Sequence, residues 1–560
     1  MSNTNENLKP LIAHFYHWEK VQPDKVFLRQ PKGDTWKTLT YAEAGQEARK
    51  MATALAAKGL QQGDHIGIFS KNCYHWILAD LAIMMGGYVS APFYASLPKQ
   101  QLAEVIELSD IKALFVGKLD KWGDRDQAIP TEVQVIKFPH YEGSAEINIG
   151  EDWKELVAEH APKTDNYTPY LEDLWTIKFT SGTTGTPKGV MLAHRSPVSM
   201  MAAEKETNWI GLYKLPEIRC LSYLPLNHVG ERIGMELIVI TMGGSISFAE
   251  NLDTFNQNLR DTQPTIFFAV PRIWTKFYLG VIAKMPIEKL DAMLANPAMA
   301  DTIKKKLRAS LGFAALGVAA TGAAITPAFL KDFYKKLDIH LIEAYGMTET
   351  CGGITNSPSL DAPQDSVGKA RPFAEIKIHN ETDEVLLKTP YMMMGYYKNP
   401  EKTAEVLVDG WMHSGDRGTI DENGYLRIIG RVKDAFKTSK GSYVTPNPLE
   451  EVLMKNGYIE QICVAGLGIP QPIALVNLSE IGQAADRTEV EAALLESVQQ
   501  LNSQRAPFER ISTVIIQEEA WSEENRCLTP TLKVKRGTLD DKFGRQYLAW
   551  HEQKEKIIWF

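Results

Sequence analysis

The stretch "FTSGTTGTPKGV", Phe179 to Val190, is the most informative segment of this sequence. It ends the run "LWTIKF", whose aromatic and β-branched residues are typical of a strand. Gly182, Gly185 and Gly189 permit positive φ and let backbone N–H groups approach a ligand closely. Its hydroxyl side chains and its single cation are Thr180, Ser181, Thr183, Thr184, Thr186 and Lys188. This combination predicts a loop that binds phosphate oxygens.

Two other interpretations of this loop fit less well. Gly/Ser/Thr runs are usually solvated linkers, but a passive linker has no need for a proline that presents a lysine. A Walker A loop requires Gly-Lys-Ser/Thr, whereas Lys188 follows Pro187 and precedes Gly189. After the loop, Ser196 is the expected N-cap of a helix, with Pro197 at its first position.

Length and composition limit the class of protein. The chain has 560 residues, more than the ~250–300 at which single cores stop growing, so at least two domains are expected. The net charge of -8 argues against non-specific nucleic-acid binding, because no global positive field exists to release counterions. The 5 cysteines are too widely spaced for a CxxC pair, which favours a reducing, cytosolic setting.

No segment predicts export or membrane insertion. The N-terminus lacks a charged region followed by an apolar core, so we expect no signal peptide. The longest weakly polar stretch, residues 311–325, is interrupted by glycines and is too short to span a bilayer. We expect a cytoplasmic protein. The basic cluster Lys304 to Lys306 leaves open a peripheral contact at the inner membrane surface, although a solvated helix face is the commoner meaning. No pattern indicates an oligomeric state.

The order of helical and strand patterns predicts the fold class. Residues 40–60 have helical spacing and a terminal glycine, residues 63–70 resemble a strand, and residues 72–93 repeat this order. Such alternation predicts a layered α/β structure with a largely parallel sheet. Short strand-like pieces separated by turn residues near 370–430 predict a β-rich subdomain.

A polar, lysine-rich segment marks the expected domain boundary. "GRVKDAFKTSKGS", residues 430–442, is flanked by glycine and interrupts the strand-like patterns. We therefore expect a large N-terminal domain over residues 1–430. A small α+β domain over residues 431–560 has a size that is ordinary for a separate domain.

Further motifs follow the opening loop in a fixed order: "LPLNHVGER", "TGAAITP", "EAYGMTET", "GWMHSGDRG", "GRVKDAFKTSKG" and "LTPTLKVKRG". With the loop, they resemble the adenylate-forming superfamily of acyl-CoA synthetases, luciferases and peptide-synthetase adenylation domains. The resemblance runs from Thr180 to Arg536 and includes a catalytic body and a small mobile domain. "KTSKGSYVTPNPLEE" and "LTPTLKVKR" look like the long-chain fatty acyl-CoA synthetase branch.

The resemblance implies roles for residues of the N-terminal domain. Tyr345 stacks on adenine, Thr348 contacts the α-phosphate region, and Glu349 helps to hold Mg²⁺. His228 lies near the acyl channel. "EAYGMTET" follows the strand-like "DIHLI" and is expected at a strand's carboxyl end, where open α/β sheets bind ligands. Further implied nucleotide contacts are Thr180, Ser181, Gly182, Thr183, Thr184, Gly185, Lys188, Gly322, Ala323 and Gly346, with Thr183 also a metal ligand.

Other implied roles fall near the expected boundary. Asp416 accepts hydrogen bonds from the ribose hydroxyls of the nucleotide, and Arg431 makes a second ribose contact. Lys433 occupies the hinge position. The region around Gly441 lines the tunnel for the pantetheine arm of coenzyme A.

The last motif implies the catalytic lysine. Lys533 matches the lysine that bridges carboxylate and phosphate oxygens during adenylation. The motif departs from the commoner Ser-Gly-Lys-Ile pattern by having Thr-Leu-Lys-Val, which leaves Lys535 as a less favoured candidate. Spaced lysines by themselves usually indicate a basic surface strand.

The implied reaction joins a fatty acid to ATP, giving acyl-AMP and pyrophosphate, and then to coenzyme A, giving acyl-CoA and AMP. The cofactor and co-substrates are Mg²⁺, ATP and coenzyme A, and no nucleic acid is involved. Activation of an aryl or other carboxylic acid, or an acyl-AMP ligase without coenzyme A transfer, stays open. A nucleotide-binding regulator that lacks the chemistry is disfavoured by the presence of Lys188, Glu349, Asp416, Arg431 and Lys533 together. The sequence has no protein-kinase motif set.

Overall fold

The computed structural model describes residues 8–181, 187–359, 361–529 and 533–560. The chain forms two compact units. The first comprises Met1–Glu375 and Lys388–Gly410, and the second comprises Ile376–Leu387 and Trp411–Phe560. The boundary expected between residues 430 and 431 falls inside the second unit, so the division at that point stays a prediction.

The first unit contains the parallel sheet that the alternating patterns predict. β3 (His65–Ser70) lies between two parallel neighbours, β4 (Val89–Phe93) and β5 (Ile111–Gly117). The strand order across this sheet is β19-β9-β8-β4-β3-β5-β6-β7. The outer strands are β6 (Gln134–Lys137), β7 (Glu151–Asp152), β8 (Leu174–Ser181), β9 (Pro187–Ala193) and β19 (Gly395–Tyr396).

Two helices beside this sheet follow directly from their sequences. α2 (Tyr41–Ala57) begins with a capping box, in which Thr40 Oγ1 accepts a bond from Glu43 N and Glu43 Oε2 accepts one from Thr40 N. Gly59, just beyond the helix, has the positive φ that ends many helices. α3 (Tyr74–Gly86) is buried along its whole length, which explains its uninterrupted apolar sequence. Both helices confirm the sequence-based expectation.

A second sheet in the same unit has its parallel strands next to one another. β12 (Ile266–Ala269), β13 (Val318–Gly322) and β14 (Leu341–Met347) are parallel, and β15 (Gly352–Asn356) returns antiparallel to β14. The carboxyl ends of β13 and β14 therefore meet at one edge. The apolar cluster packed with this sheet includes the buried side chains Phe267, Trp274, Phe313 and Tyr334.

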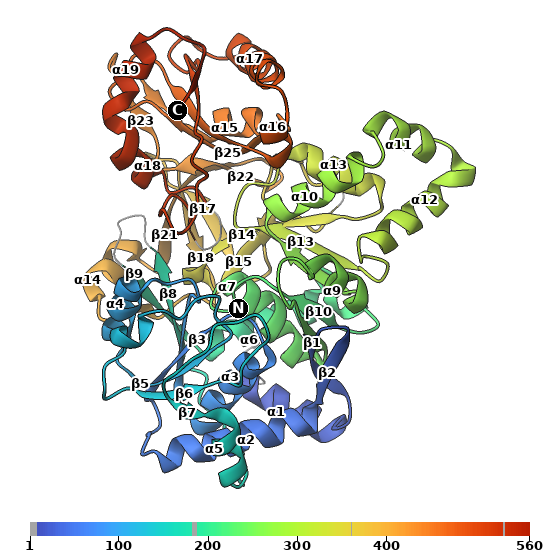
Figure 1. Ribbon diagram of the computed structural model, residues 1–560, viewed down its shortest axis with the longest axis vertical. Helices are drawn as coiled ribbons and strands as arrows, with labels where there is room; N and C mark the ends of the chain where they lie inside the picture. Colours follow the sequence, from blue (N-terminus) through green and yellow to red (C-terminus); the bar gives the residue numbers. More distant parts are fainter. Residues whose placement is uncertain (1–7, 182–186, 360, 530–532) are drawn as a thin grey trace. The chain divides into compact units, whose positions relative to one another are not determined.

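The other elements of the first unit surround these sheets (Figure 1). A third sheet has the order β10-β11-β1-β2. Its strands are β1 (Val26–Lys32), β2 (Thr35–Thr40), β10 (Arg219–Ser222) and β11 (Ser245–Phe248). The helices are α1 (Leu11–Val21), α4 (Lys99–Ser109), α5 (Trp153–Glu159), α6 (Arg195–Thr207), α7 (Val229–Glu231), α8 (Ile238–Met242), α9 (Phe255–Thr262), α10 (Pro271–Ile282), α11 (Ile287–Leu294), α12 (Pro297–Ser310), α13 (Ala328–Lys336) and α14 (Pro400–Val406).

The second unit has a sheet of its own, with strand order β25-β26-β27-β28. The strand-like pieces expected from residue 375 onward are β17 (Glu375–Ile378), β18 (Glu384–Lys388), β21 (Trp411–Ile420) and β22 (Leu426–Arg431). The other strands are β23 (Phe436–Lys437), β24 (Tyr443–Val444), β25 (Ile459–Ala465), β26 (Ile473–Leu478), β27 (Val514–Ile516) and β28 (Ile557–Trp559). The helices are α15 (Asn447–Leu453), α16 (Glu480–Ala484), α17 (Arg487–Ser503), α18 (Arg536–Phe543) and α19 (Tyr547–Glu552).

Cysteine chemistry and hydrophobicity agree with the sequence. The cysteines are free and buried, so none of them forms a disulfide. Within the described ranges, none of the helices has both the length and the hydrophobicity that crossing a bilayer requires.

Candidate active site

The predicted phosphate loop joins two paired strands. β8 and β9 are antiparallel, with Thr180 opposite Lys188 and Ser181 opposite Pro187. The other predicted contacts in the loop, Gly182, Thr183, Thr184 and Gly185, lie outside the described residues. The loop is thus closed at its base by a hairpin ladder.

The helix after the loop begins differently from the sequence expectation. The chain first returns as β9, and α6 then begins at Arg195 with His194 as its N-cap. Ser196 is therefore inside the first turn and is not the cap, so this expectation was wrong. Its side chain is buried, and Ser196 Oγ donates a long hydrogen bond of 3.4 Å to Met392 O. The need to pair β9 with β8 decides where the helix can begin.

Tyr396 brings the predicted phosphate lysine and the predicted metal ligand together. Lys188 Nζ lies 5.5 Å from the centre of the Tyr396 ring, which is within cation–π range. The Tyr396 hydroxyl donates a 2.7 Å hydrogen bond to Glu349 Oε1. β19, which carries Tyr396, pairs with β9 with Tyr396 opposite Val190. The sequence analysis missed this tyrosine, because nothing in "GYYKNP" distinguishes it from an ordinary strand residue.

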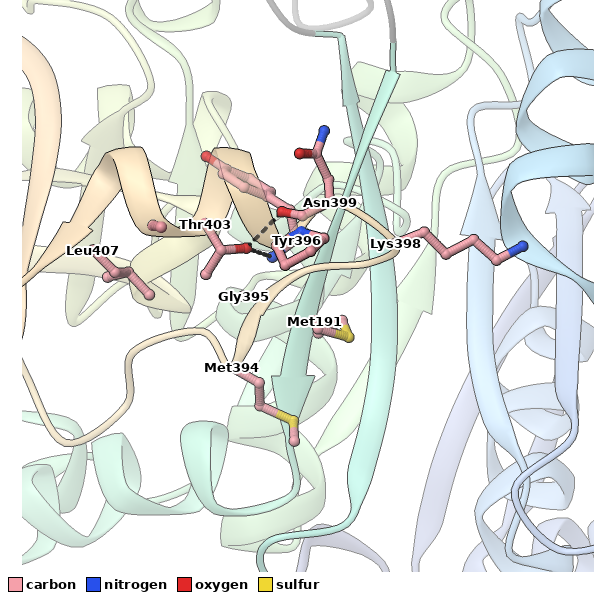
Figure 2. Close-up of a pocket in the computed structure, with 10 residues that line it drawn as sticks. Met191, Met394, Gly395, Tyr396, Lys398, Asn399, Thr403 and Leu407 are labelled. Carbon is pink, nitrogen blue, oxygen red and sulfur yellow. Dashed lines mark hydrogen bonds between the residues drawn. The ribbon is translucent and has the colours of Figure 1, made fainter.

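A pocket of about 440 Å³ opens beside Tyr396. Its rim is fixed by hydrogen bonds that Figure 2 shows: Tyr396 N donates to Thr403 Oγ1 at 2.9 Å, and Thr403 Oγ1 donates to Asn399 O at 2.9 Å. The lining is Met191, Met394, Gly395, Tyr396, Lys398, Asn399, Pro400, Thr403, Ala404 and Leu407. Most of this lining is apolar, so the pocket has few groups that could bind a phosphate.

The predicted adenine site lies where β13 and β14 end side by side. Gly322 is opposite Ala344 in the parallel ladder, and Ala323, just after β13, has a φ of 68°. A Cβ on Gly322 would lie 2.7 Å from Ala344 O, so only glycine fits this approach. Tyr345 is half-buried inside β14, which extends to Met347. The motif therefore lies at the carboxyl end of the strand, as expected, and its first five residues belong to the strand itself.

The rest of "EAYGMTET" forms a tight turn. Gly346 pairs with Gly353, and a Cβ on Gly346 would lie 1.9 Å from Gly352 O. Thr348 is buried in the short helical turn Thr348–Thr350, and Glu349 in the same turn is half-buried. Met347 N donates to Thr350 Oγ1 at 3.1 Å and so fixes the turn that presents Glu349. The predicted contacts Tyr345, Gly346, Thr348 and Glu349 are thus adjacent in one rigid segment.

His228 caps a helix, and a lysine bonds the residue before it. It is the N-cap of α7, and its Nδ1 accepts a 3.1 Å bond from Gly230 N. Lys178 Nζ, on β8, donates a 2.7 Å bond to Asn227 O. Burial lowers the pKa of Lys178 well below its usual range, and the charge of Arg232 adds to this effect. The strand before the phosphate loop therefore also fixes the backbone beside His228.

Arg232 is the centre of a buried ionic network. Arg232 is fully buried, and its Nη2 donates to both carboxylate oxygens of Asp80 at 2.6 Å. Arg232 Nε donates to Glu236 Oε2 at 3.0 Å, and Nη1 donates to Thr176 Oγ1 at 2.8 Å. The guanidinium centre lies 4.2 Å from the ring centre of Trp175. Removing one partner of such a buried set costs about 3–5 kcal/mol. This network therefore holds together the elements that carry Asp80, Thr176 and Arg232.

Glu231 is another buried carboxyl group that the sequence analysis did not single out. Its Oε1 accepts a 2.9 Å bond from Tyr223 N, and its Oε2 has no hydrogen-bond partner among the described residues. Burial raises the pKa of Glu231 to about 8, and hydrogen bonds from Ser222 and Tyr223 only partly oppose the rise. The folded chain therefore favours the protonated acid at neutral pH.

Three predicted residues of the second unit, Asp416, Arg431 and Lys533, interact with one another. Asp416 on β21 is directly opposite Arg431 on β22, and Arg431 Nε lies 2.8 Å from Asp416 Oδ1. Lys533 interacts electrostatically with both residues. Lys433 lies in the turn that follows β22, and Asp434 N in that turn donates to Arg431 O at 3.3 Å. Three predicted ligands thus meet within one unit.

Gly441 lies in a turn of its own. It is exposed between β23 and β24 and has a φ of 87°, which favours glycine. Gly441 N donates a 2.9 Å bond to Thr438 O and closes the turn. The structure does not test its predicted role at the pantetheine tunnel, and the roles of the other site residues likewise stay predictions.

Comparison with known proteins identifies the family. Residues 15–397 match the family model of AMP-binding enzymes, and residues 433–549 match the AMP-binding enzyme C-terminal domain. The chain is 30% identical to long-chain-fatty-acid–CoA ligase 5 of Rattus norvegicus, over 93% of this chain and 85% of that protein. It is 28% identical to long-chain-fatty-acid–CoA ligase FadD15 of Mycobacterium tuberculosis, over 97% of both chains.

Solved structures support the same fold. The adenylation domain of the carboxylic acid reductase of Segniliparus rugosus, solved with AMP and a carboxylic acid, has a TM-score of 0.81. The likeness covers 99% of this chain and 95% of that one at 21% identity. That fold is a mixed α/β structure, as the sequence predicts. With its family model matched over most of its length, this chain belongs to the family of AMP-binding enzymes.

Proposed function

We propose that this protein is an AMP-forming ligase that joins a fatty acid to coenzyme A. Membership of the AMP-binding enzyme family and the named activity of its relatives from rat and Mycobacterium support this proposal. The observation in the structure that carries it is the cluster of Lys188, Tyr396 and Glu349, which offers a cation and a fixed carboxylate at the base of a glycine-rich loop.

In the first step a carboxylate oxygen attacks the α-phosphorus of ATP. A new P–O bond forms, the α–β phosphoanhydride bond breaks, and pyrophosphate leaves with the electron pair. Both reactants are anions, so the barrier falls only where fixed positive charge surrounds the phosphates. Lys188 supplies such a charge in the first unit, and Lys533 supplies one in the second.

The described residues fit a magnesium ion that arrives with ATP. Mg²⁺ is usually held by one or two carboxylates together with substrate phosphates, and it supplies charge neutralisation at the phosphates. Glu349 offers one carboxylate, already oriented by Tyr396. In the described part of the chain, no group of three or more His, Cys, Asp or Glu residues could form a protein-only metal site. Thr183, the other proposed ligand, lies outside the described residues.

We propose nucleotide contacts within each of the two units. Tyr345 offers a half-buried ring for adenine at the end of β14, beside Gly322 and Ala323. Asp416 and Arg431 form an ion pair whose carboxylate can accept hydrogen bonds from ribose.

In the second step the thiol sulfur of coenzyme A attacks the acyl carbonyl carbon of acyl-AMP. A C–S bond forms, the C–O bond to AMP breaks, and the thiol proton passes to solvent or to the departing AMP. We propose that rotation near Lys433 withdraws Lys533 and brings the turn at Gly441 to the acyl-AMP. Such a change is a shift between two conformers of one chain.

Half-reaction kinetics test the proposed site. Lys533→Ala is expected to abolish ATP–pyrophosphate exchange but to spare acyl-CoA formation from supplied acyl-AMP. Lys535→Ala is the matched control and is expected to spare both reactions. Equal loss of both half-reactions in Lys533→Ala would contradict the role of this residue.

Product analysis tests the overall reaction. A series of fatty acids from short to long chains, scored for acyl-CoA, should show a maximum at one chain length. AMP release measured with and without coenzyme A separates a coenzyme A ligase from an acyl-AMP ligase. Aryl acids that react faster than every fatty acid would overturn the proposed substrate class.

A peripheral contact with an anionic bilayer is the last part of the proposal. The hairpin of α11 and α12 carries no charged residue between positions 292 and 300, and Met299 there is 42% exposed. Lys305 and Lys306 are exposed on α12, which has no buried residue. An uncharged tip next to exposed lysines is suited to the interface of an anionic membrane.

Vesicle sedimentation tests this contact. The full chain should bind vesicles with an anionic lipid fraction more strongly than purely zwitterionic ones, and salt should weaken the binding. Reversing two charges with Lys305→Glu and Lys306→Glu should lower the partition coefficient by at least about 30-fold, because loss of each lysine charge alone costs roughly 1 kcal/mol. The control Lys20→Glu with Lys25→Glu changes the net charge equally at two exposed sites. Equal losses in both double variants would reject a contact through α12.

A further inference from the structure

Arg536 is the most heavily bonded side chain near the proposed catalytic lysine. It lies three positions after Lys533, at the first residue of α18. We infer that Arg536 is a positioning residue that fixes the Lys533 segment for the adenylation step. This inference rests on the proposed function, because it acts through the role proposed there for Lys533.

The guanidinium group of Arg536 reaches three separate segments of the second unit. Its Nη2 donates a 2.6 Å hydrogen bond to Glu450 Oε1 on α15. Its Nη1 donates to Val464 O on β25. Its Nε lies 3.9 Å from Asp434 Oδ2, in the turn after β22. One side chain therefore ties the start of α18 to a helix, a strand and a turn.

Glu450 accepts hydrogen bonds from both Arg536 and Val464. The oxygen that accepts from Arg536, Oε1, also accepts a 2.7 Å bond from Val464 N. Arg536 and Val464 thus form a closed cycle with Glu450, since Val464 donates with its N–H and accepts with its carbonyl. α15 also has Leu449 and Leu453 in the core of the unit. The anchor of Arg536 is consequently a part of the fold with little freedom to move.

The contact with Asp434 links this anchor to the predicted ribose site. Asp434 N donates to Arg431 O at 3.3 Å, and Arg431 pairs with Asp416. Lys533 interacts electrostatically with the same Arg431 and Asp416. The path from Arg536 through Asp434 therefore ends at two groups, Arg431 and Asp416, that interact electrostatically with Lys533.

The short stretch of backbone from Lys533 to Arg536 is bonded to the residues that precede it. Leu528 and Val534 form a β-bridge, and Lys535 N donates to Cys527 O at 2.8 Å. Lys533 itself is tied to Thr529 by two bonds: Lys533 N donates to Thr529 Oγ1 at 3.0 Å, and Thr529 N donates to Lys533 O at 2.8 Å. These bonds cross-link residues 527–529 with residues 533–535, and Arg536 fastens the second of these stretches to α15.

Neighbouring groups keep the Arg536 guanidinium charged. Burial opposes the charge on Arg536, but Glu450, Cys463 and Asp434 outweigh this effect and raise the pKa of the guanidinium. The Arg536 and Glu450 side chains are only 17% and 16% exposed, so water cannot easily replace either partner. Lysine cannot reproduce the planar fork that bonds Glu450 and Val464 together.

Separate measurement of the two half-reactions tests the inference. In Arg536→Gln, kcat for ATP–pyrophosphate exchange should fall about 10–100-fold, which is the size expected when a catalytic group is misplaced by about 1 Å. KM for ATP should change little, because the lost interaction acts in the transition state. Acyl-CoA formation from supplied acyl-AMP should stay within about threefold, since it does not use Lys533. Arg536→Lys should recover part of the exchange rate.

Two further variants separate positioning from general damage. Arg505→Gln is the matched control, because Arg505 Nη2 also bonds α15, at Pro448 O with a length of 3.4 Å, but makes no hydrogen bond to the described residues around Lys533. It should leave both half-reactions unchanged. Glu450→Gln keeps an acceptor for Val464 N and removes the charge, so it should show the same split as Arg536→Gln even if the latter folds poorly.

The outcomes are distinct. A loss confined to adenylation in Arg536→Gln and Glu450→Gln supports the inference. Equal loss in both half-reactions, loss only of thioester formation, or no loss in either overturns it. If Lys533→Ala itself keeps pyrophosphate exchange, the proposed function of that lysine fails. If Lys533→Ala shows the split and Arg536→Gln does not, only the inference about Arg536 fails.

Discussion

Tyr396 donates its phenolic hydrogen to Glu349 Oε1 at 2.7 Å, so a side chain from β19 orients a carboxylate that follows β14. The two residues are far apart in the sequence, and both belong to the first unit. Glu349 is the proposed Mg²⁺ ligand, and mutation of a residue that orients a metal ligand typically costs about 10–100-fold in metal affinity.

Tyr396→Phe should therefore lower the apparent affinity for Mg²⁺ in adenylation. We expect the Mg²⁺ concentration for half-maximal pyrophosphate exchange to rise about tenfold, because Glu349 loses the bond that orients it. Tyr397→Phe is the matched control: it is the next residue, and its hydroxyl donates a 2.8 Å bond to Asp110 instead. An equal shift in both variants would show that Tyr396 does not act through Glu349.

Asp416→Asn should weaken ATP binding without slowing the chemistry. Hydrogen bonds to charged groups contribute about 1.5–3 kcal/mol, so KM for ATP should rise roughly 10–100-fold with kcat little changed. Stability should fall by less than about 1 kcal/mol, because Arg431 in the pair is 47% exposed. Asp421→Asn, in the turn between β21 and β22, is the control for general damage to this sheet. A fall in kcat at unchanged KM would assign Asp416 a different role.

Gly346→Ala should separate β14 from β15. An added Cβ would lie 1.9 Å from Gly352 O, so the strands must move apart, at a cost of about 1–3 kcal/mol in unfolding free energy. Urea unfolding and calorimetric ATP binding measure the two consequences. Gly353→Ala is the control, because its Cβ would meet Ala344 Cβ at an ordinary 3.4 Å. Similar stability of the two variants would contradict the close approach.

Glu231→Gln should change how stability depends on pH. Burial raises the pKa of Glu231 from 4.5 to about 8, so the folded chain binds this proton more tightly than the unfolded chain does. Its contribution to stability is fully present below pH 4.5 and is lost as pH rises through about 8. The glutamine variant avoids that loss, and each pKa unit is worth about 1.4 kcal/mol.

Urea unfolding at pH 5, 7 and 9 measures this effect. Between pH 5 and pH 9, the free energy of unfolding of Glu231→Gln should rise by about 2–4 kcal/mol relative to that of the unmodified chain. The exposed Glu401→Gln should show no such gain. Parallel pH curves for Glu231→Gln and the unmodified chain would show that Glu231 ionises without penalty.

Local patterns predicted the elements that depend on local physics. The helix α2 follows from its capping box and its terminal glycine, and the parallel strands β3 and β4 follow from the alternation of helix and strand patterns. The family and the mixed α/β fold were predicted from the motifs and are confirmed. Each of these inferences needs only residues that are close in the chain or a fixed order of motifs.

Contacts between distant segments could not be predicted in the same way. The pairing of β9 with β8 displaced the expected cap from Ser196 to His194, because strand pairing outweighs the preference of one serine for a cap. The bond from Tyr396 to Glu349 and the network around Arg232 join residues whose neighbours in sequence carry no signal for them. Tertiary packing alone brings such side chains together.

The hydrogen bonds from β8 to the segment around His228 limit how this enzyme can be re-engineered. Thr176 bonds Arg232, and Lys178 bonds the carbonyl of Asn227, two positions before the strand reaches Thr180. Remodelling this segment, where the acyl channel is proposed, is therefore expected to change the proposed nucleotide loop as well, because one strand contacts the first and leads into the second. Selection schemes that score only a new acid should therefore recover compensating changes along β8.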